Sequence, residues 1–137
     1  MTRYYIDACV WRDYFEDRRD GLRPLGEWAF QLLKKIVDEE DVVVISDHLI
    51  DELRKYLSDE QVNTVLEIIP EELKLRFHDG PEQQREAHRI GAKLLLHKSD
   101  ALHLVIALET EALLISRDHN FDHIKNRFYI YKPEELI

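Results

Sequence analysis

Four carboxylates stand where the sequence predicts the ends of buried elements. Asp7 closes the apolar run "RYYI", and Asp118 follows the apolar run "ALLIS" after Arg117. Asp100 precedes the almost fully apolar segment "ALHLVIAL", and Glu52 stands within "HLIDEL". Clustered acids repel one another and an unpaired buried carboxylate is costly, whereas a divalent cation removes that cost. Because Mg²⁺ and Mn²⁺ prefer oxygen ligands and can activate water for phosphodiester hydrolysis, the four acids predict a metal-dependent nuclease.

Each of these acids also has an ordinary structural interpretation. An aspartate at a helix start, such as Asp100, commonly interacts with the helix dipole, and Asp118 begins an Asp-His-Asn stretch that favours an Asx turn. Glu52 is typical of a solvated helix face, but it borders the apolar stripe of its helix, whereas Asp51 lies further round towards water. Asp7 has no routine structural role at the end of a buried strand. The chemical interpretation therefore depends on the set of four.

The elements that must position these acids alternate between strands and helices. Short apolar or β-branched runs predict strands over 3–7, 41–46, 73–77, 112–116 and 128–132, of which 73–77 is the weakest. Helical spacing of apolar residues predicts helices over 8–18, 24–40, 47–57, 58–69, 81–98 and 100–111. A capping box starts at Ser58, Pro70 ends that helix, and Ser99 is the expected N-cap of the last helix. This order predicts one α/β domain over residues 1–137, with three layers and a mostly parallel central sheet.

The composition fits an ordinary globular chain of 137 residues, with 45% hydrophobic and 34% charged residues. No apolar run approaches the roughly 18 residues of a membrane span, and the N-terminus lacks a signal-peptide layout, so we expect a cytoplasmic protein that does not contact the membrane. The net charge of −9 argues against a broad basic face for nucleic acid, although carboxylates that hold cations contribute to it. The single cysteine, Cys9, has no disulfide partner and no neighbouring base, so we expect it to pack in the core.

Taken together, the four acidic segments resemble the PIN domain family, and most closely its short VapC-like toxin ribonucleases. The first segment is "YYIDACVW" with Asp7, and the second is "ISDHLIDEL", in which Glu52 stands six residues after Ser46. The third is "SDALHLVIAL" with Asp100, and the fourth is "LLISRDHNFDHI" with Asp118. The last two segments are the more specific ones. The resemblance covers nearly the whole chain in the same order and implies a PIN-like fold.

The resemblance implies an endoribonuclease that depends on Mg²⁺ or Mn²⁺. Asp7 and Asp100 would hold the main metal ion, and Glu52 and Asp118 would complete the acidic pocket directly or through water. The RNA substrate would be a structured RNA such as tRNA or rRNA, a small antitoxin protein would restrain the activity, and the chain would form a homodimer. The alternative is a PIN-like module that binds RNA or protein without cleavage. The presence of all four acids disfavours that alternative.

Two positions qualify the resemblance. Ala8 stands where the family often has Ser or Thr directly after the first aspartate, which leaves Ser116 as the hydroxyl expected near the pocket. Asp122 is an additional acid that would replace or assist Asp118. A phosphotransfer domain is a poorer interpretation, because it would need a second acid close to Asp7, and "IDACV" lacks one.

Basic residues and histidines near the acids have less specific interpretations. Candidates for phosphate contacts, with ordinary surface charge as the alternative, are Lys93, Lys98 and Arg117. His119 and His123 stand four residues apart, but without cysteines or an HExxH pattern they predict a zinc site only weakly. His103 follows Asp100 by three residues and is expected to be a packed or hydrogen-bonded histidine near the pocket.

Overall fold

Short apolar runs form the five strands of the central sheet in a computed structural model that describes all of residues 1–137. The strands are β1 (Arg3–Ile6), β2 (Val42–Ser46), β3 (Lys74–Phe77), β4 (Leu113–Ile115) and β5 (Ile130–Tyr131). Their order across the sheet is β3-β2-β1-β4-β5, and every neighbouring pair is parallel. The predicted strands are confirmed, and the sheet is parallel throughout. The carboxyl ends of all five strands therefore lie along one edge of the sheet.

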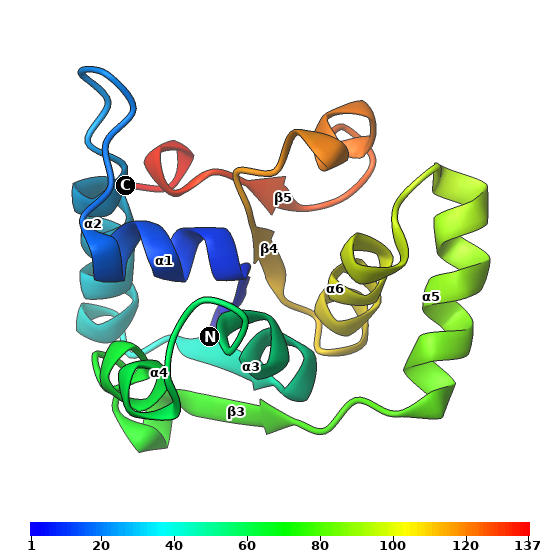
Figure 1. Ribbon diagram of the computed structural model, residues 1–137, viewed down its shortest axis with the longest axis horizontal. Helices are drawn as coiled ribbons and strands as arrows, with labels where there is room; N and C mark the ends of the chain where they lie inside the picture. Colours follow the sequence, from blue (N-terminus) through cyan, green and yellow to red (C-terminus); the bar gives the residue numbers. More distant parts are fainter.

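Helices cover both faces of this sheet, which confirms the three-layer α/β prediction (Figure 1). They are α1 (Ala8–Glu16), α2 (Leu25–Asp38), α3 (Asp47–Leu53), α4 (Asp59–Leu66), α5 (Pro81–Leu94) and α6 (Lys98–Glu109), with 3-10 helices η1 (Glu71–Leu73), η2 (His119–Ile124) and η3 (Pro133–Glu135). Figure 1 shows α1 and α2 on one side of β4, and α5 and α6 on the other. None of these helices is long and apolar enough to cross a membrane.

The buried hydrophobic residues form one continuous cluster on both faces of the sheet. Trp11, Tyr5 and Phe121 are among the largest side chains that are fully buried in it. Every residue of α6 from Asp100 to Ala107 is buried, because this helix lies between the sheet and α5. α1 and α2 approach closely at Gly26, where an added Cβ would lie 2.7 Å from the Asp13 carbonyl oxygen. These contacts pack α1 against α2, and α6 against both α5 and β4.

Two local predictions are wrong. The helix predicted over 81–98 ends at Leu94, because Leu95 takes a left-handed backbone conformation, and Lys98 belongs to the next helix. Ser99 is not the N-cap of α6, because the helix begins at Lys98 and the capping position is His97. The first helical backbone bond runs from the Ala101 N–H to the His97 carbonyl, so Ser99 lies within the first turn. Its hydroxyl contacts Glu52 and His48 of α3 instead. By contrast, the capping box at the start of α4 is present as predicted.

Candidate active site

Four acidic side chains from four separate segments line one cavity of about 180 Å³. Asp7 follows β1 and is the N-cap of α1, and Asp118 follows β4 and is the N-cap of η2. Glu52 lies in α3, and Asp100 lies in the first turn of α6. The remaining lining residues are Ala8, Cys9, Arg12, Lys55 and Tyr56. The topology thus brings together residues that are up to 111 positions apart (118 − 7), at the carboxyl ends of the strands.

The hydroxyl of Ser116 connects two of the acids. It donates a hydrogen bond of 2.8 Å to Asp7 Oδ2 and accepts one of 3.0 Å from the backbone N–H of Asp118. Asp118 also accepts a bond of 2.9 Å from the N–H of Asn120, so it forms the expected Asx turn and still lines the cavity. Ser116 and Asp7 are both buried. The Ser116 hydroxyl therefore lies between the two acids, and its supporting role in the site stays a prediction.

Asp100 carries a charge that its surroundings only partly compensate. Burial raises the pKa of this carboxyl, and the charges of Asp118 and Asp7 raise it further. The Asn120 amide acts in the opposite direction, since it donates a hydrogen bond of 2.9 Å to Asp100 Oδ2. The net effect is a raised pKa for Asp100, and a bound cation would favour its ionised form. Oxygen donors held this way match the preference of Mg²⁺ and Mn²⁺ for carboxylate ligands, so the residues present fit such an ion.

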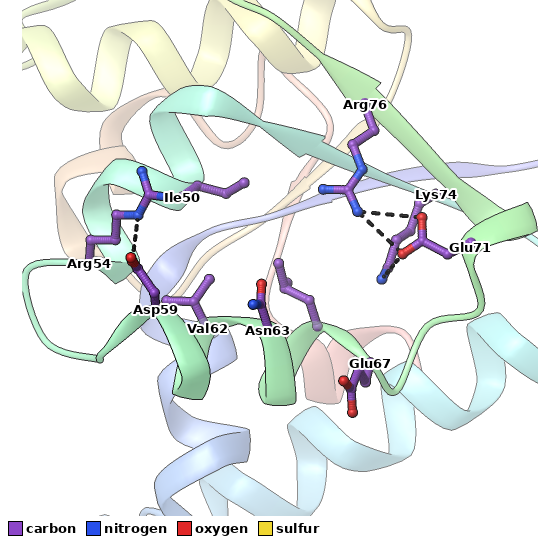
Figure 2. A pocket seen from close by; sticks show the side chains of 10 residues that line it. Ile50, Arg54, Asp59, Val62, Asn63, Glu67, Glu71, Lys74 and Arg76 are labelled. Carbon is purple, nitrogen blue, oxygen red and sulfur yellow. Dashed lines mark hydrogen bonds and ion pairs between the residues drawn. The ribbon is translucent and has the colours of Figure 1, made fainter.

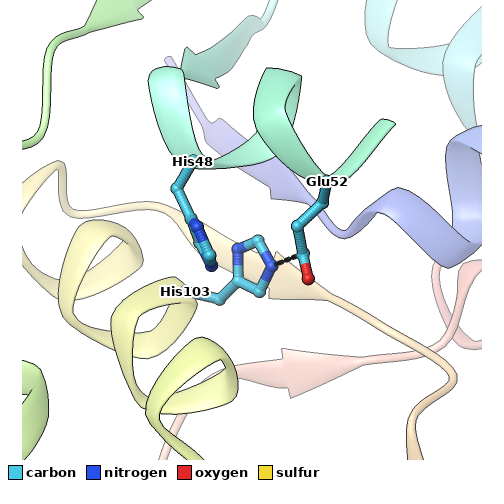
Figure 3. Close-up of side chains that lie close together, drawn as sticks. All are labelled: His48, Glu52 and His103. Carbon is cyan, nitrogen blue, oxygen red and sulfur yellow. Dashed lines mark hydrogen bonds and ion pairs between the residues drawn. The ribbon is translucent and has the colours of Figure 1, made fainter. Parts of the chain in front are cut away.

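Glu52 is held differently, by a hydrogen bond with His103 (Figure 3). Burial by itself would raise the pKa of Glu52, but the hydrogen bond and positive charge of His103, with a hydrogen bond from Ser99, lower it to about 2. Burial would lower the pKa of His103, but the Glu52 hydrogen bond and the Asp7 charge raise it overall. His103 Nε2 lies 3.5 Å from Asp7 Oδ1. His103 is therefore the basic partner inside the acidic group, and its surroundings favour the protonated form.

A chain of hydrogen bonds through Tyr5 and Ser46 fixes the His103 ring. Its Nδ1 lies 2.7 Å from the Tyr5 hydroxyl, which lies 2.7 Å from the Ser46 hydroxyl. Ser46 Oγ also accepts the N–H of Leu49 at 3.0 Å and so caps α3, the helix that carries Glu52. All three side chains linked in this way, Tyr5, Ser46 and His103, are buried. His103 is therefore the packed, hydrogen-bonded histidine near the pocket that the sequence predicted.

His48 was not expected at the site. Its ring lies 4.4 Å from that of His103 between centroids, and its Nε2 lies 3.0 Å from the Ser99 hydroxyl. Burial lowers its pKa, and the charge of His103 lowers it further. Figure 3 shows His48, Glu52 and His103 pointing toward one another, and their ligand atoms lie within 4.8 Å. The spacing of four residues between His48 and Glu52 was the signal, because it places both on one helix face.

The other candidate residues do not line the cavity. Arg117 pairs with Asp13 at 3.1 Å and with Glu134 at 2.7 Å, and only 11% of its side chain is exposed. Lys93 and Lys98 border other hollows of the surface around α5 and α6. As RNA contacts these three residues remain predictions. Asp122 is exposed and accepts a hydrogen bond of 2.9 Å from His119.

Cys9 does line the cavity, but as a poor nucleophile. Burial raises the pKa of its thiol far above the ordinary range, and the charge of Asp7 raises it further. The thiol lies 4.0 Å from the Ser116 hydroxyl, and this contact and a hydrogen bond with the Arg117 backbone lower its pKa only in part. Because the thiolate is the reactive form of cysteine, this environment makes the side chain a packing residue beside Asp7.

A larger hollow of about 450 Å³ lies elsewhere, between α3, α4 and β3 (Figure 2). Apart from the exposed Glu67, its charged residues pair with one another: Arg54 contacts Asp59 at 2.9 Å, and Glu71 contacts Lys74 at 2.9 Å and Arg76 at 3.3 Å. None of the carboxylates there carries an uncompensated charge of the kind found at Asp100. The volume of a hollow alone therefore does not identify the candidate active site.

Comparisons with known proteins identify the family and the fold of this chain. The family model described as the PIN domain matches residues 4–127. A toxin–antitoxin complex from Klebsiella pneumoniae contains a chain with a TM-score of 0.69 and 18% identity, in an alignment covering 95% of this chain and 97% of that one. VapBC2 from Rickettsia felis, bound to a promoter DNA fragment, contains one with a TM-score of 0.66 and 15% identity, covering 96% and 98%.

A third similar structure is VapC20 from Mycobacterium tuberculosis, described as a toxin that cleaves the sarcin–ricin loop. Its TM-score is 0.65 at 13% identity, and the alignment covers 91% of this chain and 95% of that one. A comparison with curated protein sequences found no match. At these identities the structures show a shared fold, which confirms the PIN-like architecture expected from the sequence.

Proposed function

The chain belongs to the PIN domain family, and on that premise we propose that it is an endoribonuclease that depends on Mg²⁺ or Mn²⁺ and acts as the toxin of a toxin–antitoxin pair. The observation that carries the proposal is the convergence of Asp7, Glu52, Asp100 and Asp118 on one cavity at the carboxyl edge of the sheet. The toxin–antitoxin complexes among the similar structures support the assignment of a toxin.

In this proposal Asp7 and Asp100 hold the main metal ion, and Glu52 and Asp118 complete the pocket directly or through water. When bound, such an ion supplies an activated water and stabilises the leaving oxygen of the phosphodiester. The chain's own residues orient the ligands. Ser116 fixes the Asp7 carboxylate, and His103 keeps Glu52 ionised, because it lowers the Glu52 pKa to about 2.

Cleavage of purified tRNA and rRNA tests the proposal. The wild-type protein should cut at least one of these RNAs with Mg²⁺ or Mn²⁺ and should stop when EDTA is added. Asp7→Asn and Asp100→Asn should each lower the cleavage rate by more than the roughly 10–100-fold that loss of an outer-shell partner costs. Asp122→Asn is the matched control, because it removes an acid that lies outside the cavity.

The alternative of a non-catalytic binding module predicts a different result. In that case the wild-type protein would bind RNA but leave it intact at every metal concentration. Folded Asp7→Asn and Asp100→Asn variants that cleave as fast as the wild type would show that these acids do not hold the reactive metal. Circular dichroism of each variant separates a loss of chemistry from a loss of fold.

The proposed partners need separate measurements. A short open reading frame directly upstream would encode the antitoxin, and its product should copurify with this chain and suppress RNA cleavage. Light scattering coupled to size-exclusion chromatography should give the mass of a homodimer, twice the 16.4 kDa of one chain. A monomer would remove the homodimer from the proposal without affecting the nuclease assignment.

A further inference from the structure

Arg12 of α1 carries an unsatisfied polar group beside the acidic cavity. Its Nε is the only buried side-chain nitrogen or oxygen in the protein that has no hydrogen-bond partner. Its one ion pair is a contact of 3.4 Å with Glu16 one helical turn away. None of the four pocket carboxylates forms a hydrogen bond or an ion pair with it. A buried donor without an acceptor is unfavourable, so the Arg12 guanidinium is not fully paired within this chain.

An exposed aromatic ring holds Arg12 in this place. The guanidinium carbon lies 3.8 Å from the centroid of the Tyr56 ring, a cation–π contact between α1 and the turn that follows α3. Tyr56 is 60% exposed, although it is a large aromatic residue. Because Arg12 covers only one face of the ring, the remainder is open to a second planar group.

A second cation stands next to this pair. Lys55 is exposed, and its ammonium group forms no hydrogen bond or ion pair. Arg12, Lys55 and Tyr56 all line the same cavity as the four acids. In a chain with a net charge of −9, these two cations are the only basic side chains that line it.

We propose that Arg12, Lys55 and Tyr56 form a subsite that binds one nucleotide of single-stranded RNA at the mouth of the acidic cavity. The guanidinium and ammonium groups contact the phosphate, since charged hydrogen bonds to phosphate favour a planar Arg fork supported by Lys. The Tyr56 ring stacks on the unpaired base, as aromatic side chains do in single-strand binding sites. An acidic peptide would use the cations but would leave the open ring without a planar partner.

The inference rests on the proposed function, because it assigns the neighbour of the phosphodiester that the acids would cut. The subsite also explains how a cavity lined by four acids can attract RNA, which is a polyanion. Four carboxylates repel phosphate, and two cations at the rim reduce that repulsion where the RNA backbone enters. The subsite favours unpaired nucleotides, because a base within a duplex cannot reach the ring.

Binding of a fluorescein-labelled single-stranded RNA of about 12 nucleotides tests the subsite. Fluorescence anisotropy is measured in an Asp100→Asn background, which prevents cleavage. Tyr56→Ala should weaken binding about 10-fold or more through loss of the base stack, and Arg12→Ala should do so through loss of the phosphate contact and of the cation that packs on the ring. Tyr56→Phe should retain binding because it keeps the ring. Lys55→Ala should weaken binding by less and reduce the slope of log Kd against log salt by about 1.

Two matched variants control for charge and aromatic content. Arg54→Ala removes a neighbouring cation that contacts Asp59 and lines a different hollow. Tyr129→Ala removes a tyrosine that is 72% exposed and does not line the cavity. Both should bind the RNA like the parent. Arg12→Lys, which keeps the charge and the helix, replaces Arg12→Ala if that variant melts early.

The outcomes separate the subsite from the nuclease. A wild-type chain that cleaves RNA, with Tyr56→Ala and Arg12→Ala no weaker in binding than the two controls, overturns the subsite alone. A wild-type chain that cleaves no RNA, but whose RNA binding depends on these residues, overturns the nuclease and supports the subsite. Absence of any RNA binding by the parent overturns the subsite whatever the cleavage result.

Discussion

Asp100→Asn should make the metal-free protein more stable while it destroys the response to metal. The carboxylate is buried, and the charges of Asp118 and Asp7 raise its pKa along with that burial. Two like charges about 4 Å apart near a protein surface repel by roughly 1–4 kcal/mol. The hydrogen bond from Asn120 offsets part of this repulsion, and an asparagine oxygen can still accept it. We therefore expect a net stabilisation of about 1–2 kcal/mol.

Thermal unfolding followed by circular dichroism measures the effect. For a chain of this size about 1 kcal/mol corresponds to roughly 4 °C, so Asp100→Asn should melt about 4–8 °C above the wild type in EDTA. The order should reverse with metal. At 100 times its dissociation constant, a bound ion adds about 2.7 kcal/mol to the wild type, or about 10 °C, and little to the variant. Asp122→Asn should follow the wild type in both buffers.

The pH dependence gives an independent check. Because the folded-state pKa of Asp100 is raised, the folded chain retains this proton where the unfolded chain has lost it. The favourable contribution is present below the ordinary pKa of about 3.9 and is lost as the pH rises through the folded-state pKa. The advantage of Asp100→Asn in EDTA should therefore grow from acid to neutral pH. An Asp100→Asn variant that melts below the wild type in EDTA at neutral pH would refute this reasoning. A metal-induced rise in the melting temperature of Asp100→Asn as large as that of the wild type would refute it as well.

Two further predictions concern the support of the site. His103→Ala should lower the free energy of unfolding by about 3 kcal/mol in urea, because it leaves Glu52 half-buried without its charged partner. The loss should be largest between about pH 4.5 and 6.5. Below that range Glu52 becomes protonated as the pH approaches its folded-state pKa of about 2. Above that range His103 loses its proton, and the stabilisation that its raised pKa provides is lost. A difference in unfolding free energy between wild type and variant that stays constant with pH would contradict the pairing. Gly26→Ala should destabilise by more than about 2 kcal/mol, since its Cβ would meet the Asp13 carbonyl oxygen at 2.7 Å, whereas Gly80→Ala, with open space around it, should melt within a few degrees of the wild type.

The sequence was sufficient to predict that the four acids lie close together, because their positions follow from local patterns. A buried strand that ends in a polar residue delivers it to the carboxyl edge of a parallel sheet, and Asp7 lies there. The helical stripe distinguished Glu52 from Asp51, and in the structure Glu52 is half-buried while Asp51 is exposed. Both inferences need only the spacing of apolar residues along one helix or strand and the direction in which that element runs.

The partners of the acids could not be predicted in the same way. α6 is buried on every side, so its sequence has no polar face from which the direction of His103 could be read. The Ser99 prediction was wrong for a related reason. A serine before Asp-Ala-Leu is a good local cap, but here the hydroxyl contacts Glu52 and His48 from another helix. Arg12 and Tyr56 likewise meet only because α1 packs beside α3.

Ser116 is the hydroxyl that connects two of the acids, and it does so through two hydrogen bonds. The same oxygen donates to Asp7 and accepts the backbone N–H of Asp118, so it ties the ends of β1 and β4 together at the cavity. These strands are direct neighbours, and the Asp7 N–H bonds the Ile115 carbonyl at 2.9 Å. The relative position of the two carboxylates is thus set by the sheet register rather than by flexible side chains. A site fixed in this way holds the Asp7 and Asp118 carboxylates ready for a cation, while the basic His103 contacts the other oxygen of Asp7 at 3.5 Å.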